Sequence, residues 1–268
     1  MKIALIVTTY NNVDVLRLSL KTALHQSVAP TEIIVADDGS TPDTAELVKK
    51  IAEKTDTPLY HCWQEDIGFR PARCRNMAIS RSSADYCILI DGDIILDVHF
   101  IEDHLRHARE GFFVQGSRVI LSEEKTNTIL ASGDPRVGLF DYNIGNRKNC
   151  IRSSILSQLF STKNKKLGGI KTCNFAFWKR DAVMVNGFNE DFVGWGHEDT
   201  EFAARLLTIG IQRQNVKFNA LAYHLYHPTH SRDSLARNDA LLLETKRHKK
   251  KWCENGLDKH IGNCSQCT

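Results

Sequence analysis

Three features are scarce in this chain: long apolar runs, an excess of one charge, and clustered cysteine. No apolar stretch approaches the ~18 residues that a membrane-spanning helix needs, and the run Ile3–Val7 is too short for the core of a signal peptide. The 35 Lys and Arg residues against 32 Asp and Glu residues leave a net charge of +3, which gives no reason to expect a nucleic-acid partner. We therefore expect a cytoplasmic protein that does not bind nucleic acid.

Cysteine is sparse and scattered, with eight residues in a chain of 268, so a disulfide scaffold is not expected and reduced thiols are the simpler interpretation. One group near the C-terminus is an exception: Cys253, His260, Cys264 and Cys267. These residue types could bind zinc, but the spacing from Cys253 fits no common zinc finger, and free thiols are the favoured interpretation.

What the chain does have is an ordinary globular composition, 42% hydrophobic and 25% charged, with ample length for one large core. In its first hundred residues, short apolar runs alternate with stretches of helical period. Strands are expected at Ile3–Val7, Glu32–Ala36, Pro58–Trp63 and Tyr86–Ile90, and helices at Val13–Leu24, from Ser40 to Ile51, and at Ala72–Arg81. This alternation predicts an α/β fold with a mostly parallel sheet, whose ligands bind at the carboxyl ends of the strands.

The second half has a mixed pattern. Residues 142–171 are rich in Lys and Arg without one acidic residue, which predicts a mobile basic loop around a short helix. The other elements expected here are helices at Ile151–Phe160, Thr200–Leu207 and Leu235–Trp252, and strands at Thr172–Trp178 and Val216–Tyr226.

Polar side chains follow the expected strands. Asp91-Gly92-Asp93 could turn two carboxylates toward one hard cation, although a polar turn would look the same. Asp37 and Asp38, before Gly39-Ser40, could accept hydrogen bonds from a pyrimidine base or a ribose; the alternative is a turn with Ser40 as a helix N-cap.

Arginines gather where the third helix is expected to start. Arg70, Arg73 and Arg75, with Asn76, could bind a diphosphate or a base edge, whereas each one taken singly would be read as a surface charge. The run Lys246–Lys251 at the end of the last helix could touch anionic lipid headgroups or could be a solvated face.

The most unusual stretch runs from Gly194 to Asp199. Gly194 and Gly196 flank Trp195, so a large flat ring could project from a tight turn and stack on a sugar. Glu198 and Asp199 follow at a helix start, where a carboxylate could deprotonate a hydroxyl or could complement the helix dipole.

Three histidines recur at the end of the last strand: His224, His227 and His230. Because a strand alternates its faces, His224 and His227 can both point inward only if the chain bends, as Pro228 would encourage. One of the three is expected to be a metal ligand, and the others surface or capping residues.

In this order, Thr9-Tyr10-Asn11, Asp37-Asp38-Gly39-Ser40, Ala72 to Asn76 and Asp91-Gly92-Asp93 resemble the motifs of family 2 glycosyltransferases with the GT-A fold. The stretches Asn174 to Phe177, Gly187-Phe188 and Gly194 to Asp199 resemble the C-terminal part of galactosyl- and N-acetylgalactosaminyltransferases, including bacterial chondroitin-type polymerases.

The resemblance implies roles for individual residues. Asp93 would hold Mn²⁺ or Mg²⁺ together with a late histidine; His224 matches the polymerases, the sequence His230 to Asp233 echoes the galactosyltransferases, and we choose His224. Asp199, beside Glu198, would be the general base, and Trp195, with Gly194 and Gly196, would contact sugar. The donor nucleotide sugar would be bordered by Thr9, Tyr10, Asn11, Asp37, Asp38, Arg70, Arg75, Asp91 and Gly92.

The resemblance thus implies a single-domain GT-A enzyme that inverts configuration while moving a hexose or N-acetylhexosamine from a UDP-sugar to a glycan or lipid-linked glycan, in bacterial lipopolysaccharide or capsule synthesis. Residues 1–110 would bind the donor, 111–232 would bind the acceptor and carry the base, and 233–268 would form a C-terminal helix and tail, with a peripheral contact to the inner membrane surface. Two alternatives stay open: a nucleotidyltransferase acting on sugar phosphates, and a non-catalytic protein that binds sugar nucleotides or glycans.

Overall fold

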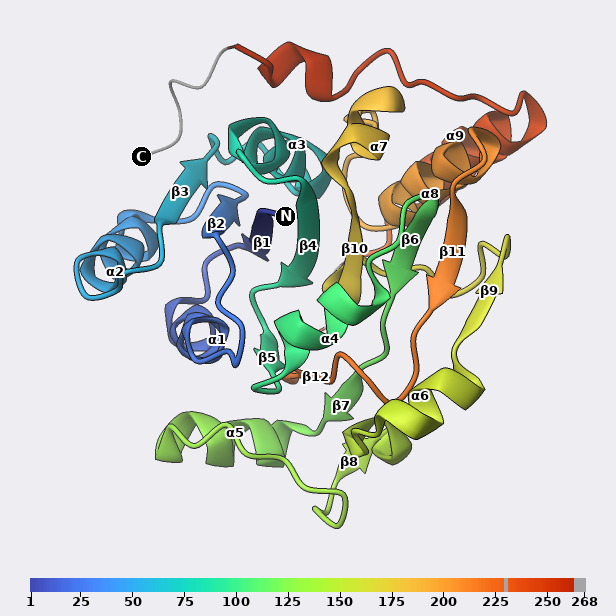
Figure 1. The fold of residues 1–268 in the computed structure, drawn as a ribbon. Coiled ribbons are helices and arrows are strands. Elements are labelled where there is room, and N and C mark those ends of the chain that lie inside the picture. Colours follow the sequence, from blue (N-terminus) through green and yellow to red (C-terminus); the bar gives the residue numbers. More distant parts are fainter. Residues whose placement is uncertain (229–230, 263–268) are drawn as a thin grey trace.

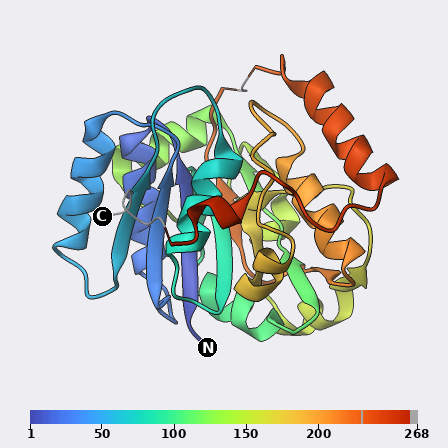
Figure 2. The same ribbon diagram turned by 90° about the horizontal axis from the view of Figure 1, so that it is seen from above.

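The computed structural model describes residues 1–228 and 231–262. Its central sheet has the strand order β3-β2-β1-β4-β10-β6-β11-β9, with helices on both faces (Figures 1 and 2). The strands are β1 Ile3–Thr9, β2 Glu32–Asp37, β3 Leu59–Trp63, β4 Tyr86–Asp91, β6 Phe112–Gln115, β9 Thr162–Asn164, β10 Phe175–Trp178 and β11 Gln212–Asn215. β1 to β4 run parallel to one another, whereas β10 is antiparallel to both of its neighbours.

A smaller sheet lies at the carboxyl ends of these strands, in the order β5-β12-β7-β8. Its members are β5 Ile94–Leu96, β7 Val119–Leu121, β8 Ile144–Gly145 and β12 Ala222–His224. β5 follows β4 after two residues and pairs with β12 from the far end of the chain. This pairing brings the end of β4 next to the end of β12.

Alternate residues of β1 build two layers of core. Leu5 and Val7 pack with helices α1 Val13–Leu24, α2 Pro42–Ala52 and α4 Phe100–His107 on one face. Ala4 and Ile6 pack on the other face with α3 Pro71–Arg81, α7 Lys179–Met184 and α8 Glu198–Thr208. Both faces are covered, which explains why these strands are continuous apolar runs in the sequence. The expected α/β fold with a mostly parallel sheet is confirmed.

Several expected elements differ from the structure. Of the strand expected at Val216–Tyr226, Ala222–His224 forms β12, whereas the part before it is not a strand because Phe218 and Ala220 adopt positive φ. The strand expected from Thr172 begins only at Phe175, after a 3-10 turn η2, Thr172–Asn174. The last helix, α9 Leu235–Arg247, stops short of Trp252, and Lys249 has a positive φ just beyond it.

The basic segment is an ordered part of the fold rather than the mobile loop expected from its composition. It carries β8, a 3-10 turn η1 Arg147–Cys150, helix α6 Ser154–Phe160 and β9, after helix α5 Glu123–Ser132. α6 starts later than expected, because the Ser153 hydroxyl accepts a hydrogen bond from the backbone N–H of Leu156 and so caps it. At α2, Thr41 rather than Ser40 occupies the cap position.

Among the described residues, the thiols of Cys74, Cys87, Cys150, Cys173 and Cys253 are free, as expected, whereas Cys62 is disulfide-bonded. Cys253 is buried against the carbonyls of residues 185 and 186, and His260, in the 3-10 turn η3 Leu257–His260, pairs with Glu190 instead. These two side chains therefore have other partners than a shared zinc ion. Cys264 and Cys267 lie outside the described residues.

The described helices include none that is long and apolar enough to cross a membrane.

A buried ion pair joins α8 to its surroundings. Arg205 is fully buried, bonds Glu201 through two contacts of 2.8 and 2.7 Å, and donates to the carbonyl of Gly187 at 2.7 Å. The Thr245 hydroxyl of α9 donates to the same Glu201 carboxylate at 3.0 Å. Removing one member of a buried pair leaves the other charge uncompensated.

We expect Arg205→Met to lower the free energy of unfolding by about 3–5 kcal/mol in urea titrations, because Glu201 is left as a buried unpaired charge. The control is Arg180→Met, which breaks an exposed pair with Glu110 and should cost less than about 1 kcal/mol. Equal losses in the two variants would show that the Arg205 pair is not a structural anchor.

Candidate active site

The carboxyl ends of the parallel strands are tied to one another by backbone bonds, as expected. The N–H of Asp38 donates to the carbonyl of Thr9 at 3.0 Å, and the N–H of Gly92 donates to the carbonyl of Thr8 at 2.6 Å. A Cβ at Gly92 would lie 3.0 Å from that carbonyl oxygen and 3.1 Å from the Thr9 hydroxyl. Glycine is therefore the residue that lets the Asp91–Asp93 turn lie against β1.

The two neighbouring carboxylates after β2 have different environments. Asp37 is fully buried, accepts a hydrogen bond from the Ser40 N–H and lies 2.8 Å from His61 Nε2. Both oxygens of Asp37 therefore have partners inside the protein. Asp38 accepts from the Arg70 N–H and the Gln64 amide, and burial raises its pKa to about 6.

The residues at the end of β1 and in the loop after it differ in their contacts and in their exposure to solvent. Asn11 has a positive φ, and its side-chain oxygen accepts from the Thr41 N–H at 2.9 Å, so it holds the start of α2. Thr9 is buried, whereas Tyr10 is 44% exposed and donates to Asp66 at 3.1 Å. Of these three residues, Tyr10 and Asn11 are thus the exposed ones.

A hollow of about 470 Å³ lies beside this loop and is lined by Trp63, Glu65, Ile67, Arg70 and Arg73. Trp63 is 41% exposed, and its indole N–H donates to the carbonyl of Ser40 at 3.0 Å. The Arg70 guanidinium donates to the carbonyl of Glu65. A half-exposed indole can stack on a flat ring, and the arginines beside it can bind a negatively charged group attached to that ring. The sequence pattern predicted Trp63 as the last residue of a strand and did not indicate that its ring lines a hollow.

The structure brings Asp93 together with two histidines. His224 Nε2 lies 3.5 Å from Asp93 Oδ2, and His227 Nε2 lies 3.2 Å from the same atom. One ligand atom from each of the three residues lies within 4.8 Å of the others. β12 ends at His224, so the chain can turn and His227 can face the same point. His224 and His227 are therefore both candidate ligands beside Asp93, and His230 lies outside the described residues.

The donor set of Asp93, His224 and His227 fits a divalent metal ion. Asp93 Oδ1 is buried and has no hydrogen-bond partner, which leaves a ligand atom available. Burial and the nearby Asp91 carboxylate raise the pKa of Asp93 to about 7. Burial, with the positive charge of Arg118, lowers the pKa of His224 to about 3, so its ring is neutral, as a metal ligand must be. One carboxylate and two imidazoles suit Mn²⁺ and other first-row divalent ions.

The Trp195 loop packs against the N-terminal half of the chain. The N–H of Gly194 donates to the carbonyl of Phe69 at 2.8 Å. Gly194 and Gly196 both have positive φ, and a Cβ at Gly194 would lie 2.2 Å from the Ser234 hydroxyl. The ring of Trp195 is 39% exposed, and the Arg232 guanidinium lies 5.3 Å from its centroid. The loop thus presents the indole that the sequence predicted, with a cation above it.

Arg75 connects the two halves of the site. Its guanidinium donates to Glu198 at 2.9 Å and to Asp91 at 3.5 Å, and its Nε donates to the Thr8 hydroxyl at 3.3 Å. Burial lowers the pKa of Arg75, but the Glu198 and Asp91 carboxylates outweigh this and raise it above its usual value. The side chain is 5% exposed, so Arg75 is engaged with the protein's own carboxylates rather than open to a nucleotide.

Glu198 and Asp199 are thereby separated in role. Glu198 is held by Arg75, whereas among residues 1–228 and 231–262 the Asp199 carboxylate accepts hydrogen bonds from Thr200, through its N–H at 2.5 Å and its hydroxyl at 3.0 Å. Burial and the adjacent Glu198 carboxylate raise the pKa of Asp199 to about 7. A carboxylate with a pKa near the working pH is suited to proton transfer.

Comparison with known proteins agrees with this geometry. The model of glycosyl transferase family 2 matches residues 4–179, and that of the N-terminal domain of galactosyltransferase matches residues 156–230. The chain is 28% identical to a hyaluronan synthase of Pasteurella multocida and 24% identical to a chondroitin synthase of Escherichia coli, in each case over 84% of its length. It spans only 25% and 35% of these two relatives.

Solved structures share the fold at low sequence identity. The S. aureus protein TarS, residues 1–349 in complex with UDP, has a TM-score of 0.60 at 17% identity and covers 98% of this chain and 70% of that one. A mannosyltransferase from Pyrobaculum calidifontis, in complex with GDP-Man and Mn²⁺, has a TM-score of 0.60 at 16% identity and covers 92% and 63%.

The chain belongs to glycosyl transferase family 2, and its fold is GT-A-like. Family membership favours a glycosyltransferase over the nucleotidyltransferase that the sequence motifs had left open.

The electrostatic coupling at the start of α8 can be measured directly. We expect Glu198→Gln to lower the pKa of Asp199 from about 7, because the substitution removes a neighbouring negative charge and frees the positive charge of Arg75. The measurement is an NMR titration of the side-chain carboxyl carbons. Glu46→Gln, on the exposed face of α2, is the control that should leave Asp199 unchanged; an unchanged value in Glu198→Gln as well would contradict the coupling.

Proposed function

We propose that the protein is a metal-dependent, inverting glycosyltransferase that moves a hexose or an N-acetylhexosamine from a UDP-sugar to a glycan or lipid-linked glycan acceptor. Residues 1–110 bind the donor, and residues 111–232 supply the acceptor surface and the base. One observation supports the proposal: Arg75 bonds both Asp91, two residues before Asp93, and Glu198, the neighbour of Asp199.

In this mechanism, Asp199 is the general base. Its carboxylate takes the proton of the acceptor hydroxyl as that oxygen attacks the anomeric carbon, and the nucleotide leaves from the opposite side. Glu198 is a positioning residue, because it anchors the first turn of α8 to Arg75 and keeps the Asp199 pKa near neutrality. Trp195 contacts the sugar with its exposed ring, between Gly194 and Gly196.

The metal site consists of Asp93, His224 and His227, and the ion is Mn²⁺ or Mg²⁺. When bound, the ion supplies Lewis-acid stabilisation of the negative charge on the departing diphosphate. Asp91, held by Arg75, lies on the donor side of this site. Gly92 allows the turn to approach β1 closely enough for Asp93 to face the histidines.

The donor nucleotide lies in the hollow between the β1 loop and the Trp63 edge. The Asp38 carboxylate accepts from the base, Tyr10 borders the ring, and Arg70 is placed for charged groups of the nucleotide. TarS in complex with UDP supports a uridine donor, whereas the mannosyltransferase in complex with GDP-Man offers the alternative nucleotide. Asp37 and Asn11 act indirectly, by holding the loops that carry these contacts.

The acceptor context is bacterial polysaccharide synthesis, in lipopolysaccharide or capsule. The names of the hyaluronan and chondroitin synthases support a growing glycan as acceptor. The reaction would take place in the cytoplasm, with a peripheral contact to the inner membrane surface where the acceptor is lipid-linked.

A screen of UDP-sugars for Mn²⁺-dependent release of UDP tests donor, class and cofactor together. We expect turnover with a UDP-hexose or UDP-N-acetylhexosamine, and its abolition by EDTA. In Asp93→Asn, both turnover and Mn²⁺ binding measured by calorimetry should fall by at least about tenfold, because the carboxylate ligand is lost. The control is Asp56→Asn, which changes an exposed carboxylate in the loop before β3. Unchanged metal binding in Asp93→Asn would reject the metal site.

The base is tested by Asp199→Asn, which keeps the shape of the side chain and removes its basicity. We expect turnover to fall by about 10²- to 10⁴-fold, with Mn²⁺ binding and thermal stability retained. In the unchanged protein, turnover should rise with pH through about 7, because Asp199 acts only when deprotonated. Near-normal transfer by Asp199→Asn would assign the base to another residue.

A further inference from the structure

Helix α6 has its apolar side chains on the outside. Ile155 is 72% exposed and Leu159 is 71% exposed, and their spacing of four residues places them on one face of the helix. Phe160 follows at 57% exposure. We call these three residues the α6 surface. Contiguous exposed apolar side chains of this size mark an interaction site rather than an ordinary surface.

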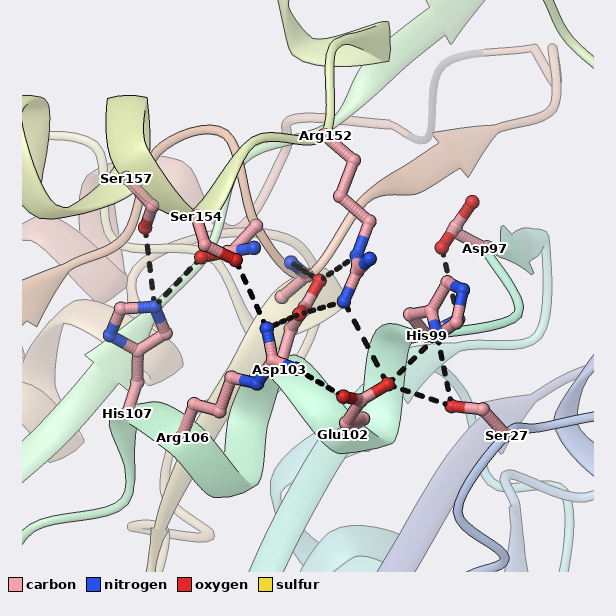
Figure 3. A network of polar contacts seen from close by, with 12 residues as sticks. Ser27, Asp97, His99, Glu102, Asp103, Arg106, His107, Arg152, Ser154 and Ser157 are labelled. Atoms are coloured by element: carbon pink, nitrogen blue, oxygen red, sulfur yellow. Dashed lines mark hydrogen bonds and ion pairs between the residues drawn. The ribbon is translucent and has the colours of Figure 1, made fainter.

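The inner face of α6 is polar and fixed to the body of the protein, as Figure 3 shows. The Ser157 hydroxyl, 1% exposed, lies 3.2 Å from His107 Nε2, and the Arg106 guanidinium donates to the Ser154 hydroxyl at 3.0 Å. The buried residue of α6 is thus polar, whereas a helix that packs on a core buries apolar side chains. Leu156 is half-buried, and Ile155 and Leu159 face outward.

A buried ion pair next to the helix fixes this orientation. Arg152 donates to both oxygens of Asp103, at 2.9 and 2.7 Å, and Asp103 is fully buried on α4 (Figure 3). The same carboxylate accepts from the N–H of Ala220 at 3.0 Å. Rotating the apolar side chains of α6 inward would break this bidentate pair, so their exposure is built into the fold.

Exposed basic residues flank the α6 surface: Arg147 and Lys148 before it, and Lys163, Lys165 and Lys166 after it. Residues 142–171 contain no acidic residue, and Asp141, at the border, is already paired with Lys125 at 2.6 Å. Two exposed aromatic residues, Phe140 and Tyr142, lie in the loop before Arg147. The Arg147 guanidinium donates a hydrogen bond to the carbonyl of Leu139 in this loop.

We propose that the α6 surface and its basic flanks form a docking face for an anionic lipid bilayer. Apolar side chains enter the boundary between headgroups and acyl chains, while lysines and arginines beside them pair with negative headgroups. A second protein with acidic side chains over the same area is the alternative that the vesicle test separates from a bilayer. The proposal is independent of the donor and of the reaction.

The C-terminal run Lys246–Lys251 is the weaker membrane candidate. It stands between Glu244 and Glu254, and Lys250 already pairs with Glu244 at 2.6 Å. The segment that leads into α6, by contrast, contacts a residue near the candidate metal site: Asn149 of η1 donates to the carbonyl of Arg118, whose charge acts on Asp91 and Asp93.

The test is co-sedimentation of the full chain with vesicles of phosphatidylcholine alone and of phosphatidylcholine mixed with phosphatidylglycerol. We expect binding to the anionic vesicles, weakened by added salt. The double variant Ile155→Ser with Leu159→Ser should bind at least about tenfold more weakly, because two apolar side chains no longer enter the interface. Lys163→Ser with Lys165→Ser and Lys166→Ser should show a similar loss.

The matched control replaces exposed apolar residues elsewhere, Met184→Ser with Leu243→Ser, and should leave vesicle binding unchanged. Melting temperatures of all variants show that each one is folded. No binding of the unchanged protein to anionic vesicles would overturn the proposal. So would full binding by the Ile155/Leu159 variant, or a dimer in light scattering that disappears in that variant, since a second copy would then cover α6.

Discussion

One guanidinium group holds the site together. Arg75, from the helix after β3, lies between Asp91 at the end of β4 and Glu198 at the start of α8, and also bonds the hydroxyl of Thr8 on β1. It is the physical link between the nucleotide-binding half of the chain and the half that carries Asp199. Because the group is buried, both carboxylates depend on it for compensation of their charge.

Four carboxylates are bonded to Arg75 or lie within two residues of one that is: Asp91, Asp93, Glu198 and Asp199. Asp93 and Asp199 both have raised pKa values, each because of burial and a carboxylate close by in the sequence. Such a site favours a bound cation at Asp93 and a proton acceptor at Asp199. Transfer of a sugar to a hydroxyl requires both functions. The neutral ring of His224 and the ring of His227 complete the cation side.

The parts of the fold that are set locally could be predicted from the sequence, namely the strands and helices of the first hundred residues and the convergence of their carboxyl ends. The break between β11 and β12 could not, because Phe218 and Ala220 adopt positive φ without any glycine to signal it. The choice of His224 over His227 rested on the alternation of faces along a strand, whereas β12 ends before His227 and both rings lie near Asp93. Asp37 and Asp38 look equivalent in the sequence; the burial of Asp37 depends on His61, 24 residues away.

The central claim is that one metal ion binds next to the base across the Arg75 link. A crystal of the protein grown with MnCl₂ and UDP, measured at the manganese absorption edge, tests it most directly. The account predicts one anomalous peak at coordination distance from the carboxylate of Asp93 and the rings of His224 and His227, with the diphosphate on its open side and Asp199 facing the same cavity. A peak at other residues, or UDP bound away from Asp93, would contradict it.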